Sequence, residues 1–236
     1  MEIAENDIIF TNSFNSYKAK FEVLKELYED DFPKLLRLFD IRLRLALSLK
    51  IGFDNTISYT KTETTRKTYN LILRLNDLWF AYEGLYKLCS KKSYLKSNPT
   101  KSDPFTVEKI TELLLDEKVT NFGNYLSNIY ENSRTKTDFI NYIQYLIDNS
   151  TGVTQQRLLN RLKNKVPHEE NPEFNEILSL IYGMRNMYVH NTDTAKSGVK
   201  QYNTKILALK NCNDFLTLIL LTISTKIIEE KIDDVE

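Results

Sequence analysis

Three side chains between residues 185 and 190 have the types and the spacing needed to act on a phosphate group. Arg185, Asn186 and His190 follow the apolar run 177–181. A guanidinium presents permanently charged donors that suit a phosphate, and an imidazole can move a proton near neutral pH. Without a metal, these two groups are the minimum for cleaving a ribose–phosphate linkage by attack of the neighbouring 2′-hydroxyl.

Helical geometry sets a condition on this chemistry. Asn186 and His190 are four residues apart and share one face of a helix. Arg185 and His190 are five residues apart, roughly 140° around an ideal helix. We therefore expect Arg185 and His190 to converge only if the helix frays at His190 or if a second chain completes the site.

This arrangement resembles the HEPN superfamily of α-helical proteins. The family pattern is an arginine, usually followed by a polar residue, and then a histidine after four to six intervening positions. Arg185, Asn186 and His190 fit this pattern with four residues between the arginine and the histidine. An apolar helix before the motif and a long final helix after it extend the resemblance over about 174–231.

The resemblance implies a metal-independent endoribonuclease, without a cofactor, whose active site forms across a homodimer. In such members, which are often toxins or antiviral effectors, the arginine and histidine act on the scissile phosphate and leave a 2′,3′-cyclic phosphate. Carried over to this chain, Arg185 stabilises charge on the phosphate, His190 is the general base or acid, and Asn186 orients His190 or the phosphate. Some toxin members carry a modifiable tyrosine two places after the histidine, where this chain has Thr192, so regulation by that route is not expected.

A second arginine and histidine satisfy the loose form of the same pattern. Arg161 precedes His168 with six residues between them, but Leu162 follows the arginine and Pro167 precedes the histidine. We interpret this pair as a coincidence. The ordinary alternative for His190 is a histidine placed favourably at the negative end of a helix dipole, with Asn191 as a cap.

Other residues could contact RNA or support the site. A basic patch could steer an RNA backbone, although a solvated helix face explains the same residues: Arg157, Arg161, Lys163 and Lys165. We predict that Trp79, Phe80 and Tyr82 are core residues rather than base-stacking platforms. Glu83 either orients an arginine near the site or forms a structural ion pair.

Composition excludes several other classes of function. The 32 basic and 32 acidic residues cancel, so RNA or DNA contact must come from a local patch rather than an overall basic excess. With six glycines there is no phosphate-binding glycine loop, and two histidines cannot form a His-rich metal site. Cys89 and Cys212 match no metal-ligand spacing. A disulfide between them stays open, but two reduced thiols in a cytosolic protein fit better.

The hydrophobic periodicity predicts an all-α, HEPN-like bundle of roughly seven to nine helices and no sheet. We expect one domain over 1–236, with a motif-bearing core at about 65–92 and 174–232 and a possible helical insertion at 93–173. Residues 93–105 are predicted to be a linker or loop. The predicted helices cover 14–31, 33 to about 52, 65–90, 106–117, 121–130, 137–147, 154–165, 174–190 and 202 to about 231.

The most apolar stretch, 215–228, is interrupted by polar residues and is shorter than the roughly 20 residues of a membrane span. We therefore expect a buried central helix and a soluble, cytoplasmic protein with no membrane partner. The sequence as a whole favours a HEPN-type endoribonuclease in a defence, toxin–antitoxin or RNA-processing setting, with a possible antitoxin or regulatory partner. The alternative is a catalytically inactive helical module that dimerises or binds a nucleotide or RNA.

Overall fold

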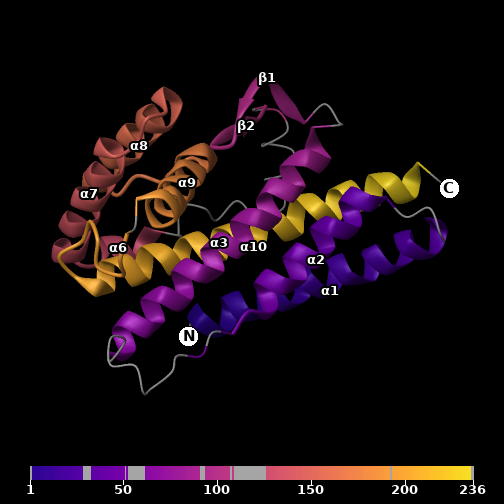
Figure 1. Cartoon of the computed structure of the whole chain (residues 1–236), viewed down its shortest axis with the longest axis horizontal. Coiled ribbons are helices and arrows are strands. Elements are labelled where there is room, and N and C mark those ends of the chain that lie inside the picture. Colours follow the sequence, from indigo (N-terminus) through magenta and orange to yellow (C-terminus); the bar gives the residue numbers. More distant parts are fainter. Residues whose placement is uncertain are drawn as a thin grey trace.

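The protein is an all-α multi-helix bundle (Figure 1). The computed structural model describes residues 2–28, 33–50, 52, 62–90, 94–106, 108, 126–191 and 193–234. Within these ranges it has eight α-helices, one short 3-10 helix and one small hairpin. The elements are α1 (Glu2–Tyr28), α2 (Lys34–Ser48), α3 (Glu63–Cys89), β1 (Leu95–Thr100), β2 (Asp103–Phe105), α6 (Ser127–Tyr130), α7 (Ser133–Asp148), α8 (Val153–Lys165), η4 (Val166–His168), α9 (Phe174–His190) and α10 (Tyr202–Asp233).

The helices form two groups that share α10. In Figure 1, α1, α2 and α3 lie along α10, while α6, α7, α8 and α9 gather around its N-terminal end. As predicted, the apolar stretch 215–228 lies in a central helix, because most of its side chains are buried between the other helices. By length and composition α10 alone, among the described helices, could cross a membrane, but 72% of its most apolar window is buried, as in the core helix of a soluble protein.

Local signals explain where several helices begin. Thr62 caps α3 by accepting the Thr65 backbone N–H at 3.2 Å, and Asn132 caps α7 by accepting the N–H groups of Arg134 and Thr135. The caps place the starts of these helices two and four residues before the predicted positions. The predicted bounds of α9, 174–190, agree with the structure.

The predicted start of the first helix is wrong, because α1 begins at Glu2 instead of residue 14. Phe10 and Phe14 both pack against the core, so apolar contacts hold helical chain before residue 14. The predictions for 29–31, 51, 107, 109–117 and 121–125 fall outside the described residues.

The expectation of no sheet is also wrong, since β1 and β2 form an antiparallel hairpin with an irregular register. The alternation of apolar and polar residues is too short in this segment to predict strands. Tertiary contacts hold the hairpin on the bundle: the Tyr82 hydroxyl donates to the Lys101 carbonyl at 3.0 Å. Phe105 is buried with its ring centroid 5.8 Å from that of Phe174 on α9. The predicted linker is thus a structured connection against α3 and α9.

Candidate functional site

The helix α9 places the motif at its C-terminal end. At the other end, Glu173 and Glu176 form a reciprocal capping box in which the Glu176 carboxylate accepts the Glu173 backbone N–H at 2.7 Å. The apolar face of α9 is buried against α3, α7 and α8. Arg185 and Asn186 are half-buried at the edge of that face, and His190, the last helical residue, is exposed.

The structure brings Arg185 and His190 together within one chain. Arg185 Nη1 lies 3.1 Å from His190 Nε2 and also 3.1 Å from Asn186 Oδ1. The helix is intact through His190, because the Asn191 backbone N–H still donates to the Met187 carbonyl at 3.1 Å. The expectation that convergence requires fraying or a second chain is therefore wrong: the long arginine side chain spans the offset of five residues.

The contact with Arg185 assigns different roles to the two ring nitrogens of a neutral His190. A guanidinium can only donate hydrogen bonds, so His190 Nε2 accepts, and the proton of the neutral imidazole resides on Nδ1. The exposed imidazole thus presents a basic nitrogen beside a fixed positive charge.

Asn186 holds the guanidinium rather than the imidazole. The Asn186 side-chain oxygen accepts one Nη1 hydrogen of Arg185. Within the described residues, Asn186 itself makes no side-chain hydrogen bond to His190. With both Nη1 hydrogens occupied, the Nη2 hydrogens of Arg185 have no partner in the described part of the chain. Those hydrogens can donate to an incoming anion.

Phe80 of α3 lies beside this pair, and its predicted place in the core is wrong. Its side chain is 40% exposed, whereas Trp79 and Tyr82 are buried as predicted. Arg185 Cζ lies 5.9 Å from the centre of the Phe80 ring, and Arg42 Cζ of α2 lies 5.8 Å from it. The large apolar residues buried on α3 include those at 72, 75, 78, 79, 82, 85 and 88, and this helical spacing, which leaves position 80 outside the core, was the signal in the sequence.

Neighbouring side chains fix the helix pair that carries Phe80 and Arg185. The Trp79 ring on α3 stacks on Tyr182 of α9 with centroids 5.3 Å apart. Glu83 accepts hydrogen bonds from Trp79 Nε1 at 3.1 Å and from Lys101 Nζ at 2.6 Å. Burial acts to raise the pKa of Glu83, but the hydrogen bond and charge of Lys101, with smaller effects of Trp79 and Arg185, lower it below its usual value. Of the two roles predicted for Glu83, orienting an arginine or forming a structural ion pair, the structure shows the ion pair, with Lys101.

The loop that follows the motif is anchored by a buried ion pair. The Asp193 carboxylate accepts the Tyr145 hydroxyl at 2.6 Å and lies 3.5 Å from Lys205 Nζ. Lys205 also donates to the Ser197 carbonyl at 2.8 Å. Burial lowers the pKa of Lys205 to about 8, against the opposing effect of Asp193. Arg185 lines the same small cavity as Asp193 and Lys205, so this ion pair packs next to the arginine of the motif.

The four residues of the predicted basic patch lie on α8, and each is close to a carboxylate or an amide oxygen of the same chain. Arg161 and Lys165 both pair with Glu173 and with the fully buried Glu176. The other two cations also have polar neighbours: Lys163 Nζ donates to Gln144 Oε1 at 2.7 Å, and Arg157 lies 4.0 Å from Asp103. These contacts leave less free positive charge on α8 than the sequence suggests.

Other candidate groups do not come together in the described part of the chain. Arg161 is held by glutamates, and His168 lies in η4 without a contact to it. No group of three or more potential metal ligands occurs among the described residues. Cys89 and Cys212 are both buried and are not joined by a disulfide, and Thr192 is outside the described residues.

Comparison with known proteins finds no counterpart. No protein-family model, no curated protein and no solved structure matches this chain.

Proposed function

We propose that this protein is a metal-independent endoribonuclease of HEPN type. The observation that carries the proposal is the 3.1 Å contact between the Arg185 guanidinium and Nε2 of the exposed His190. This pair combines a phosphate-binding cation with a base, and no carboxylate forms an ion pair with Arg185 among the described residues, although its charge acts on Glu83. The resemblance of residues 174–231 to HEPN proteins supports the same chemistry.

In the proposed reaction, the substrate phosphate replaces His190 as the partner of Arg185 Nη1, and the freed His190 Nε2 takes the proton of the ribose 2′-hydroxyl. The 2′-oxygen attacks the adjacent phosphorus, the bond from phosphorus to the 5′-oxygen breaks, and the products end in a 2′,3′-cyclic phosphate and a 5′-hydroxyl. Arg185 donates to the non-bridging oxygens, where negative charge increases in the transition state. Asn186 keeps the guanidinium in place through its bond to Nη1.

The leaving 5′-oxygen needs a proton donor, and this favours a homodimer. The chain has only two histidines, and His168 lies on η4 at the end of α8 rather than beside His190. A second copy of the chain, related by a two-fold axis, would supply its own His190 as the acid. We propose this dimer, in the cytoplasm and in a defence, toxin–antitoxin or RNA-processing setting, as the acting form.

Phe80 extends the site toward the nucleobase. Single-stranded RNA is commonly bound by stacking its bases on exposed aromatic rings next to cations. Phe80 has that exposure, with the guanidinium groups of Arg42 and Arg185 nearby. We therefore assign Phe80 to base stacking and Arg185 to the adjacent phosphate.

The proposal is tested by incubating the purified chain with end-labelled single-stranded RNA in EDTA. We expect cleavage that leaves cyclic-phosphate ends, and we expect His190→Ala to slow it by about 10²–10⁴-fold. Arg185→Lys keeps a charge but loses the fork geometry, and should slow cleavage by about tenfold or more. Phe80→Leu should raise KM more than it lowers kcat.

Another arginine and the second histidine of the chain supply matched controls. His168→Ala and Arg134→Gln, which removes an exposed arginine of α7, take away the same side-chain types outside the site, and both should cleave at the wild-type rate. Equal cleavage by wild type and His190→Ala would refute the assigned site. Binding of RNA without cleavage, with a folded wild-type dimer, would instead support the inactive binding module.

A further inference from the structure

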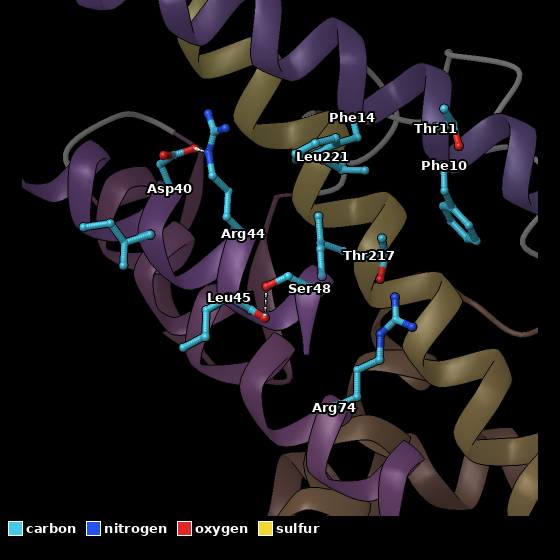
Figure 2. A pocket seen from close by; sticks show the side chains of 12 residues that line it. Phe10, Thr11, Phe14, Asp40, Arg44, Leu45, Ser48, Arg74, Thr217 and Leu221 are labelled. Carbon is cyan, nitrogen blue, oxygen red and sulfur yellow. Dashed lines mark hydrogen bonds and ion pairs between the residues drawn. The ribbon is translucent and has the colours of Figure 1, made fainter. Parts of the chain in front are cut away.

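A large cavity lies between α1, α2, α3 and α10, and none of the described residues that line it belongs to α9. Its volume is about 870 Å³, within the roughly 300–1,000 Å³ of small-molecule sites. Figure 2 shows its lining side chains. Half of the twelve described residues that line it are aromatic or aliphatic: Phe10, Phe14, Ile41, Leu45, Leu47 and Leu221. A ligand of this space therefore needs an extended apolar body.

One end of the cavity is polar. In Figure 2, the Arg74 side chain of α3 is directed toward Thr217 of α10. Arg74 has no hydrogen bond or ion pair in the described part of the chain, and its Nε is buried without a partner. The Thr217 hydroxyl likewise has no partner there. The buried Nε of Arg74 lacks an acceptor, which is unfavourable, and the guanidinium carries an unpaired positive charge, so this end of the cavity is suited to an anion.

The other arginine of the cavity differs, because its charge is compensated. Arg44 Nε donates to Asp40 Oδ1 at 2.7 Å, and the Tyr17 hydroxyl donates to the same oxygen at 2.9 Å. Glu22 lies 3.7 Å from the Arg44 guanidinium. Among the described residues that line the cavity, the unmatched charge is therefore the single positive charge of Arg74, which matches a ligand with one negative charge.

We propose that this cavity binds a free carboxylic acid with a long apolar body, such as a fatty acid. The carboxylate accepts hydrogen bonds from the Nη groups of Arg74 and from the Thr217 hydroxyl, and charge-assisted bonds of this kind are the strong ones. The chain of the acid packs against Phe10, Phe14 and Leu221. This inference does not depend on the proposed ribonuclease activity, because the two sites share no residue.

The test is a titration of the purified full-length chain with dodecanoate and with dodecan-1-ol, both below the concentrations at which they aggregate. The alcohol has the same chain length and no charge. We expect one saturable dodecanoate site per chain, with an affinity about tenfold or more above that for the alcohol. Arg74→Gln should abolish this preference, and Thr217→Val should weaken dodecanoate binding by a few fold.

Arg134→Gln is the matched control, since it removes an exposed arginine on α7 that does not line the cavity, and it should bind dodecanoate as the wild type does. Equal affinity for the acid and the alcohol, or unchanged dodecanoate binding by folded Arg74→Gln, would overturn the proposal. So would binding that requires anionic phospholipid vesicles. A dimer that excludes dodecanoate and dissociates in Ile41→Asp would assign the cavity to a second copy of the chain.

Discussion

Replacing Gly198 with alanine should strongly destabilise the loop that follows the motif. Gly198 has a φ of +77°, in the left-handed region that glycine adopts readily. A Cβ at this position would lie 2.4 Å from Tyr145 Cδ1 and 2.8 Å from Tyr142 Cδ2. The rings of Tyr142 and Tyr145 stack with centroids 6.3 Å apart, and Tyr142 is fully buried, so neither ring can move away without disturbing the α7–α10 interface.

The loss of stability in Gly198→Ala has two sources, the left-handed backbone conformation and the overlap of the new Cβ with the tyrosine rings. A left-handed conformation costs a residue with a Cβ roughly 1–2 kcal/mol, and overpacking a buried contact costs about 1–3 kcal/mol. We therefore expect Gly198→Ala to lower the free energy of unfolding by about 3 kcal/mol. With m-values of roughly 1–3 kcal/mol/M in urea, the midpoint should fall by about 1 M or more.

The assay is urea denaturation followed by circular dichroism and by the fluorescence of Trp79, the single tryptophan of the chain. Trp79 is buried against Tyr182 of α9 and therefore reports the α3–α9 contact. Gly52→Ala is the control: nothing lies within 4 Å of its Cβ position, and it should change the free energy of unfolding by about 0.5 kcal/mol or less. A Gly198→Ala protein within that same range, with an unchanged m-value, would contradict the close packing of this loop on the two tyrosines.

Two further predictions concern buried charges near the motif. Asp138, which is buried, accepts the backbone N–H groups of Lys200 and Gln201 at 2.9 Å each where α10 begins; Asp138→Ala should lower the free energy of unfolding by about 2–4 kcal/mol, measured by urea denaturation, and Asp138→Asn, which keeps one acceptor, should lose less. Lys205 has a pKa lowered to about 8 from an ordinary 10.5, so between these values the unfolded chain binds the proton more tightly and stability rises with pH. Between pH 8 and pH 10, the free energy of unfolding of the wild type should rise by about 2 kcal/mol relative to that of Lys205→Met. If the two proteins give parallel profiles of unfolding free energy against pH, the pKa of Lys205 is not lowered and the prediction is refuted.

The helical architecture and the position of the motif were predictable because they depend on local signals. The apolar spacing and the glutamates at 173 and 176 specify α9, and few glycines or prolines interrupt the longer helices. The hairpin at 95–105 was not predictable, since its strands are short and contain Pro99 and Pro104. Contacts with Tyr82 and Phe174, which are distant in sequence, hold it in place.

The candidate site also has features that the sequence predicted and features that depend on tertiary contacts. The sequence alone determined that Arg185, Asn186 and His190 share the end of one helix, because a helix repeats every 3.6 residues. Only the tertiary structure decided that the Arg185 side chain turns toward His190, that exposed Phe80 lies beside it, and that carboxylates pair with Arg161 and Lys165 of α8. These features depend on side-chain reach and on helices that meet only after folding, and helical periodicity specifies neither of them.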